Sequence, residues 1–301
     1  MSSPAAVSHR LIPFAATFAA VAALSLMDAV MKSAALVAGV YTATLLRSLI
    51  GAAMIAPFWL ARGWRWPSPP ALKLHIERGI ISAFMALSFF FALTRLPIAE
   101  AIAISFIAPL IALYFARVLL GEQIRRQAVF ASVLGLAGTL VIVGGRLGRS
   151  DLSPDVLLGL ASLIFSALLY AYNFVVIRRQ SQVAGPLEVA TFHSGIGGLV
   201  LLLFAPFFWV TPALEPLGSI TIGAGLTVTA AMALAWAYAR EEAQALVPIE
   251  YSAFLWASLF GWLFFREAVT APTIAGTALI VTGCWIATRK PPASVDKPSR
   301  Q

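Results

Sequence analysis

The chain is a succession of long apolar runs separated by short polar segments. Ten runs, each about 17–24 residues long, hold few charged side chains. A helix rises about 1.5 Å per residue and the hydrocarbon core of a bilayer is about 30 Å thick, so each run is near the length of one membrane-spanning helix. The predicted spans are Leu11–Met31, Val40–Leu60, Ile76–Thr94, Ile98–Leu119, Gln127–Val143, Val156–Ile177, Leu187–Val210, Gly218–Ala239, Gln244–Phe264 and Pro272–Thr288.

The first run has an alternative interpretation as a cleaved signal peptide, because His9 and Arg10 precede it. It is longer than the apolar core of a typical signal peptide, and it carries Asp28 near its end. It also opens a series of similar runs. We therefore expect it to remain as the first helix. The polar tail, residues 289–301, is predicted to be disordered and cytoplasmic.

One stretch of the sequence occurs twice. Shifted by 145 residues, Arg95–Glu122 lies on Arg240–Glu267 without a gap. Each copy is a basic residue, a short polar link, a long apolar run and a terminal acid. A fixed offset held over this length predicts a duplicated unit, with chance matching of Ala and Leu as the alternative. The predicted units are residues 11–145 and 156–288.

The distribution of Lys and Arg predicts the orientation. With a cytoplasmic N-terminus, fifteen of these residues fall in inner segments and five, Lys32 among them, in outer segments, while Arg47 lies within a helix. Cytoplasmic segments carry the excess of basic residues in membrane proteins. Both termini are therefore predicted to be cytoplasmic.

Each unit has five spans, and an odd number makes the second unit enter the membrane from the opposite face. Glu122 is then expected on the cytoplasmic side and Glu267 on the outer side. Inverted units related by a pseudo-twofold axis in the membrane plane are common in secondary transporters, with the site near the middle of the bilayer. The predicted fold class is an all-α integral membrane protein of ten transmembrane helices in two inverted five-helix repeats.

Composition narrows the class further. Of 301 residues 60% are hydrophobic and 11% are charged, against about 25% charged in soluble domains. The net charge of +8 comes from basic residues between the apolar runs, which fits membrane orientation and not nucleic-acid binding. The single cysteine, Cys284, excludes an intramolecular disulfide. No phosphate-binding loop, zinc motif or nucleophile motif occurs, so no cofactor and no enzymatic activity are expected.

Several short motifs resemble the drug/metabolite transporter superfamily in its EamA branch. They are LLGE at Leu119–Glu122, LFFRE at Leu263–Glu267, GLAG with Gly135 and Gly138, and MDAVMK at Met27–Lys32 followed by Arg47. The resemblance covers about residues 11–288. It implies a ten-helix carrier of small polar metabolites in the bacterial inner (cytoplasmic) membrane, commonly an amino-acid exporter, whereas other branches import vitamins or S-adenosylmethionine. The second copy departs from the pattern at Arg266, where the first has Gly121, so the resemblance does not establish the tight turn typical of glycine there.

Two charged residues inside the apolar runs are candidates for the outer mouth of a transport site. Asp28 and Arg47 have similar predicted depths, which indicates an ion pair. Charges in hydrocarbon are expensive unless they are paired or hydrated. The pair is either a substrate-carboxylate or proton-coupled gate, or a structural clamp between the first two helices.

Glu250 occupies the equivalent inner mouth, with His193 at similar depth. Glu250 is a candidate proton carrier during transport, and the alternative is a helix start that faces cytoplasmic water. His193 is either a packed or interfacial histidine or a pH sensor.

Further residues are predicted to shape the pocket. Tyr170 and Asn173 are three apart and share one helical face. Trp236 is predicted to line the pocket, although most of the aromatic residues must face lipid or the membrane interface. Ser105 lies near a proline, Pro109, that can kink the fourth span. Small residues, among them Gly138 and Gly195, are expected to allow close helix contact.

These features predict a secondary carrier that works by alternating access around a central pocket. The favoured activity is export of amino acids, with aromatic or hydrophobic ones preferred. The alternative is import of a vitamin or nucleoside-like metabolite such as riboflavin or S-adenosylmethionine, and a third class is a non-transport accessory protein or enzyme. The expected partners are a small-molecule substrate and the lipid bilayer, not nucleic acid, and the protein is expected to be a monomer or a weak homo-oligomer.

Overall fold

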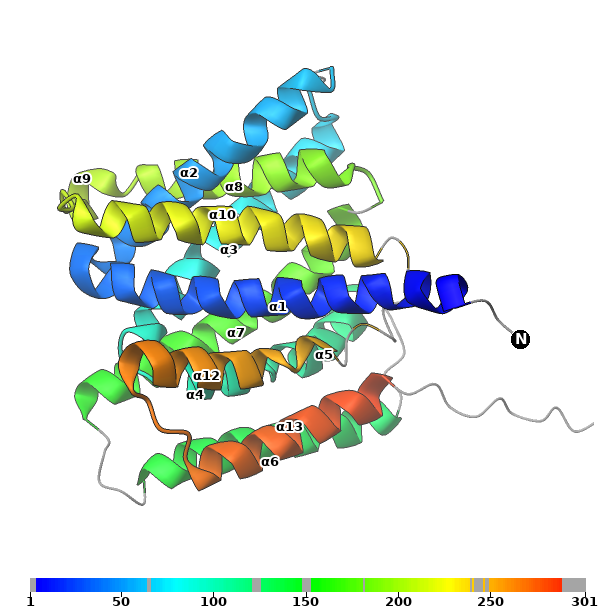
Figure 1. Ribbon diagram of the computed structural model, residues 1–301, viewed down its shortest axis with the longest axis vertical. Coiled ribbons are helices and arrows are strands. Elements are labelled where there is room, and N and C mark those ends of the chain that lie inside the picture. The colour runs from blue at the N-terminus through cyan, green and yellow to red at the C-terminus, as the bar shows by residue number, and fades with distance from the viewer. Residues whose placement is uncertain are drawn as a thin grey trace, which may run out of the picture.

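A computed structural model describes residues 4–63, 66–120, 126–147, 153–180, 182–238, 240, 246 and 249–288. Within these ranges the chain is helical, with no strand (Figure 1). The helices are α1 (Pro4–Ala38), α2 (Val40–Ala61), α3 (Pro69–Leu93), α4 (Ile98–Ser105), α5 (Ala108–Leu120), α6 (Arg126–Leu147), α7 (Pro154–Gln180), α8 (Pro186–Leu202), α9 (Ala205–Phe208), α10 (Glu215–Tyr238), α12 (Ala253–Phe265) and α13 (Ala271–Thr288).

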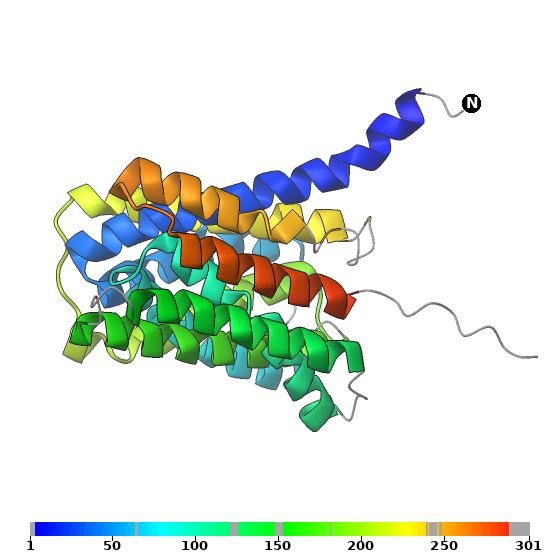
Figure 2. The same cartoon turned by 90° about the horizontal axis from the view of Figure 1, so that it is seen from below.

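The described helices have the lengths and composition of membrane spans. Six segments, one of them formed by α4 and α5 together, are long and apolar enough to cross a bilayer, and four shorter apolar helices accompany them. Large apolar side chains such as Leu140 and Leu199 are well exposed on the outside of the bundle. The predicted all-helical membrane fold is therefore confirmed. We call the end of the bundle where α1 begins the inner end; α1 extends beyond its neighbours there (Figure 2).

The fourth and ninth spans are not continuous helices; Pro109 predicts a kink in the fourth, whereas the sequence analysis expects no break in the ninth. The fourth is broken between α4 and α5 at Phe106 and Ile107, and a turn at Tyr251 and Ser252 precedes α12. Pro109 in the first turn of α5 has no N–H for the carbonyl one turn earlier, which explains the first break. The two breaks bring Phe106 and Tyr251 together, with ring centroids 5.4 Å apart. These two residues are 145 positions apart.

Backbone hydrogen bonds repeat at the same offset of 145 residues. This correspondence extends from the end of α3 and α10 to the start of α5 and α12. The paired bonds are Arg95 N to Ala92 O with Arg240 N to Ala237 O, Ile107 N to Ile104 O with Ser252 N to Ile249 O, Leu110 N to Ile107 O with Leu255 N to Ser252 O, and Ile111 N to Ile107 O with Trp256 N to Ser252 O. Chance similarity of apolar residues does not reproduce backbone geometry bond for bond, so the halves are duplicated.

The ends of α3 and α10 also share an interaction, in which an arginine stacks on an aromatic ring and donates to the carbonyl of the same residue. The Arg95 guanidinium lies 3.6 Å from the ring centroid of Phe91 and donates to the Phe91 carbonyl at 3.2 Å. Arg240 lies 4.1 Å from the ring of Trp236 and donates to the Trp236 carbonyl at 3.0 Å. Each arginine satisfies a helix-end carbonyl and places its charge near the negative end of the helix dipole.

The main contacts between helices recur when the halves are exchanged. The contacts of α1 with α10 and α12 correspond to those of α7 with α3 and α5, and α2–α10 corresponds to α8–α3. The pairs α6–α13 and α2–α8 correspond to themselves. Equivalent helices such as α1 and α7 run in opposite directions in Figure 1. The arrangement is that of two inverted five-span units around a common axis.

Helices α6 and α13 approach each other at a pair of glycines. A Cβ atom built on Gly138 would lie 2.5 Å from the Gly276 carbonyl oxygen, and one on Gly276 would lie 2.4 Å from the Gly138 oxygen. No side chain fits between these backbones, as is usual for small residues at membrane-helix interfaces. Gly138 therefore has the packing role expected of it.

We expect Gly138→Ala to lower the free energy of unfolding by about 1–3 kcal/mol, because α6 and α13 must separate to admit the methyl group. The matched control is Gly144→Ala on the same helix, where a Cβ meets nothing within 4 Å. That control is expected to be neutral or stabilising by up to about 1 kcal/mol. Unfolding in detergent micelles by titration with a denaturing detergent measures both; equal stability of the two variants would contradict the close contact.

The tight turn that the sequence left open after α12 forms without a glycine. Arg266 adopts the left-handed conformation with φ 55° and donates its N–H to the Trp262 carbonyl at 3.0 Å. The next N–H, of Glu267, reaches the Gly261 carbonyl at 3.1 Å. The Arg266 guanidinium also lies 5.3 Å from the Trp262 ring centroid. This turn directs the chain back over the end of α12 at Glu267.

Candidate functional site

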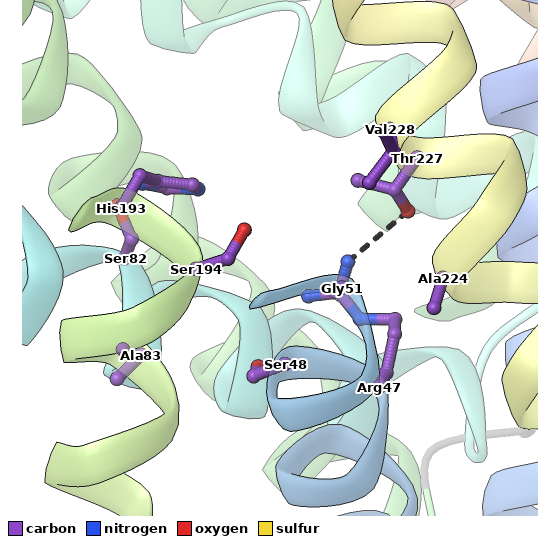
Figure 3. Close-up of a pocket in the computed structure, with 11 residues that line it drawn as sticks. Arg47, Ser48, Gly51, Ser82, Ala83, His193, Ser194, Ala224, Thr227 and Val228 are labelled. Atoms are coloured by element: carbon purple, nitrogen blue, oxygen red, sulfur yellow. Dashed lines mark hydrogen bonds between the residues drawn. The ribbon is translucent and has the colours of Figure 1, made fainter. Parts of the chain in front are cut away.

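A small polar cavity lies between four helices near the centre of the bundle. It has a volume of about 50 Å³, room for a few water molecules, and is walled by α2, α3, α8 and α10 (Figure 3). Its lining is Arg47, Ser48, Gly51, Ser82, Ala83, His193, Ser194, Gly197, Ala224, Thr227 and Val228.

The lining repeats across the two halves. Helices α2 and α8 are equivalent, as are α3 and α10, so the cavity lies where the two units face each other. Three pairs of lining residues are 145 positions apart: Ser48 with His193, Ser82 with Thr227, and Ala83 with Val228. The cavity therefore occupies the pseudo-twofold axis, the position at which inverted-repeat carriers place their substrate.

Arg47 supplies the positive charge of the cavity. It lies seven residues after Val40, about 10 Å along α2. Its Nη1 donates to Thr227 Oγ1 at 3.3 Å across the cavity (Figure 3), and its guanidinium lies 5.2 Å from the Phe90 ring centroid. Its Nε atom is buried and has no hydrogen-bond partner. The first half thus places a charged, incompletely bonded donor against the second half.

Other buried polar atoms around the cavity also lack partners. Among the described side chains these include Ser82 Oγ and His193 Nδ1, which belong to the lining, and Arg78 Nε. Arg78 precedes Ser82 by one turn of α3, and its charge acts on His193. Buried polar groups in folded proteins are almost always hydrogen-bonded. Since a guanidinium can only donate, the unmet demand here is for an acceptor, such as a carboxylate.

Asp28 lies deeper than predicted, because α1 continues to Ala38, ten residues beyond it. The carboxyl group is buried, and its charge interacts with that of Arg47. The predicted direct ion pair is not formed, because these two described side chains do not come within 4 Å of each other. The Asp28 carboxyl group therefore interacts electrostatically with Arg47 without a direct contact.

Tyr170 and Glu250 of the second half interact electrostatically with each other, and Tyr170 also interacts with Asp28; we call the surroundings of Asp28 the acidic side. The Tyr170 hydroxyl is within electrostatic reach of both Asp28 and Glu250, and its ring packs on Phe174 with centroids 4.9 Å apart. Asn173, the equivalent of Asp28, is 3% exposed and its Oδ1 has no hydrogen-bond partner. The structure thus brings Asp28, Tyr170 and Glu250 into one electrostatic neighbourhood, in which Asp28 also acts on Arg47.

Two predicted site residues make local contacts instead. Ser105, the equivalent of Glu250, donates to the Ala101 carbonyl at 2.8 Å at the end of α4. Trp236 carries the Arg240 guanidinium described above. Neither lines the central cavity, and of the seven residues predicted to bind substrate Arg47 alone belongs to its lining.

The outer end holds a buried charge cluster that the sequence did not predict. Lys32 was expected in an outer segment, but it lies inside α1 and is only 6% exposed. Its ammonium group forms an ion pair with Glu267 Oε1 and donates to the Leu96 carbonyl at 2.7 Å. Glu267 Oε2 accepts from the Ile98 N–H at 2.7 Å. This cluster, the outer lock, ties α1 and the α3–α4 link to the α12–α13 link across the two halves.

A second network crosses the halves near the inner end. His75, fully buried on α3, contacts Glu188 Oε1 through Nε2 at 2.8 Å and Gln180 Nε2 through Nδ1 at 2.7 Å. Arg78 Nη1 donates to Gln180 Oε1 at 2.7 Å. Because arginine only donates, the Gln180 amide must present its N–H to His75, whose own N–H then points to Glu188. We call these four side chains the inner lock.

Comparison with known proteins places the chain among transporters. It is 27% identical to the pseudopaline exporter CntI of Pseudomonas aeruginosa over 86% of this chain and 90% of that protein. The aromatic amino acid exporter YddG of Ancylobacter novellus is 28% identical over 66% of this chain and 70% of its own. The S-adenosylmethionine uptake transporter of Rickettsia prowazekii is 24% identical over 69% of each chain. A solved crystal structure superposes with a TM-score of 0.63 at 25% identity, covering 92% of this chain and 96% of that one.

The model of the EamA-like transporter family matches the chain twice, over residues 12–144 and 157–289. Together these matches span most of the 301 residues, one in each half of the fold. The chain is a multi-pass membrane transporter of small molecules, not an enzyme, and it belongs to the EamA-like transporter family.

Proposed function

We propose that this protein exports amino acids across the bacterial inner membrane, with both termini in the cytoplasm. The observation that carries the proposal is the cavity on the axis, where unpartnered donors gather around Arg47. A substrate carboxylate would supply the missing acceptor. Charge-assisted bonds from arginine to carboxylate are among the strongest hydrogen bonds in proteins.

The second charge of an amino acid has a counterpart on the acidic side. Asp28, with Tyr170 and Glu250 in electrostatic reach, would hold the ammonium group. Asn173 Oδ1, an unpartnered acceptor, lies on the same face of α7 as Tyr170. Positive and negative groups that interact without direct contact would suit a zwitterion, whose two charges need opposite partners.

The two locks support alternating access. The outer lock and the inner lock each join one half to the other, at opposite ends of the bundle. Opening either end requires the halves to separate there while the other lock holds. The exchange symmetry of the helix contacts supports two states of similar packing energy.

The relatives support this substrate class without agreeing on direction. Two of those named above are exporters, one of aromatic amino acids and one of pseudopaline, whereas the third takes up S-adenosylmethionine. S-adenosylmethionine carries the same amino-acid group, so its uptake is the alternative function. An aromatic preference has one local support, the Phe90 ring below Arg47.

Membrane vesicles of opposite orientation separate the two directions. We expect inverted vesicles from overproducing cells to accumulate radiolabelled phenylalanine and leucine above vector controls, because their interior corresponds to the outside of the cell. Accumulation of S-adenosylmethionine only in right-side-out vesicles would support the alternative. If no compound with an amino-acid group moves in either preparation, the proposed substrate class is wrong.

A further inference from the structure

A second hollow lies on the other face of α8, between α8 and the inner half of α2. Its volume is about 320 Å³, within the roughly 300–1,000 Å³ typical of small-molecule pockets. Trp59, Trp66 and Phe192 form its walls, and Gly195 lies at its base. Thr191 is the one hydroxyl residue of the lining, and it donates to the Leu187 carbonyl of its own helix at 2.8 Å. The groove is thus apolar, unlike the central cavity.

Gly195 has no packing reason to be glycine, contrary to the expectation of close helix contact there. A Cβ atom on Gly195 meets nothing within 4 Å, whereas one on Gly198 would lie 2.9 Å from Leu49 Cδ2. Glycine in a helix interior is unfavourable relative to alanine. Its effect at position 195 is to deepen the groove, because a larger side chain would fill it.

The position of the groove indicates its occupant. Both helices belong to the membrane-spanning bundle, and the groove opens between them toward the inner end. Two tryptophans are typical of the interface between hydrocarbon and headgroups. Arg62, exposed directly after α2, adds a positive charge at that level, and anionic headgroups are attracted to such residues.

One wall of the groove also contacts the inner lock. The Phe192 ring stacks on His75 with centroids 4.8 Å apart and an interplanar angle of 21°. It meets Trp59 edge-on at 5.4 Å. A lipid acyl chain lying in the groove would therefore press Phe192 against His75 from the lipid side.

We propose that this groove is a binding site for one acyl chain of an anionic phospholipid, whose headgroup lies beside Arg62. The site is distinct from the transport cavity, since the two use opposite faces of α8. It does not depend on the substrate or on the direction of transport. The lipid completes the apolar wall of the inner lock.

The first test is native mass spectrometry of the purified protein with phosphatidylglycerol. Wild type is expected to retain one lipid per chain, and Gly195→Leu, which fills the groove, to bind at least tenfold more weakly. Gly144→Leu is the matched control, because a Cβ there also meets nothing within 4 Å, and it should bind as wild type does. Arg62→Gln should reduce the preference for phosphatidylglycerol over phosphatidylcholine.

Equal retention of lipid by the Gly195→Leu and Gly144→Leu variants would overturn the proposal. A dimer peak that Gly195→Leu abolishes would also overturn it, because a second copy of the protein would then be the occupant.

A second measurement does not depend on the leucine variant. Phosphatidylglycerol with brominated acyl chains, at substoichiometric amounts in micelles, should quench tryptophan fluorescence. The Trp59→Phe/Trp66→Phe variant should lose most of this quenching, whereas the Trp285→Phe variant should lose little of it. The reverse result would overturn the proposal.

Discussion

Replacing Lys32 by methionine is expected to lower the free energy of unfolding by about 3–5 kcal/mol. The ammonium group is buried and holds both Glu267 and the Leu96 carbonyl. Its removal leaves the Glu267 carboxylate, whose side chain is only 15% exposed, without its cation. An uncompensated buried charge costs far more than the pair itself contributes. Titration with a denaturing detergent measures the loss.

The control for this prediction is the exposed pair Arg95–Asp155. Its N–O distance is 3.8 Å and its side chains are 26% and 78% exposed, so Asp155→Asn should cost less than about 1 kcal/mol. The Lys32→Met/Glu267→Gln double variant should be more stable than Lys32→Met alone, because no unpaired charge remains. A Lys32→Met variant no less stable than Asp155→Asn would show that the outer lock does not hold the halves together.

Replacing Arg47 by methionine is expected to reduce transport at low substrate concentration about 10–100-fold. A hydrogen bond to a charged group contributes about 1.5–3 kcal/mol, and about 1.4 kcal/mol corresponds to a factor of ten. Arg47→Lys should lie between wild type and methionine, since it keeps the charge but not the planar pair of donors. Initial rates in inverted vesicles measure the effect.

The matched control for Arg47 is Ser48→Ala in the same cavity. The Ser48 hydroxyl already donates to the Thr44 carbonyl at 2.9 Å, so its loss should change transport at most a few-fold. Thermal unfolding midpoints of the purified variants separate misfolding from lost binding. A folded Arg47→Met variant that transports at the wild-type rate would contradict carboxylate binding at Arg47.

The sequence predicted the spans and the duplication because both leave long-range signals. Lipid requires some twenty apolar residues per crossing, and a constant offset of 145 residues is visible in the printed chain. The break near Tyr251 was less visible, since the apolar run continues through it, whereas Pro109 indicated a kink close to Phe106. The predicted placement of Glu122 and Glu267 on opposite sides of the membrane is not tested, because Glu122 lies outside the described residues.

Charge is the feature by which the sequence predicts candidate site residues. Asp28, Arg47 and Glu250 stand out in hydrocarbon, whereas Ser82 and Thr227 resemble the many small polar residues of membrane helices. Only their separation by 145 positions distinguishes them, a signal the sequence analysis did not use. Lys32 was assigned to an outer segment because its partner, Glu267, is 235 residues away and a charge near a helix end usually faces water.

The odd number of spans in each unit has a consequence for how such a chain arises. A five-span unit ends on the face opposite to the one where it began, so a second copy can follow directly and is inverted without any added segment. Two copies of an even-span unit would instead lie parallel, and inversion would demand an extra crossing between them. Tandem fusion of one ancestral gene was therefore sufficient to make an antiparallel pair permanent.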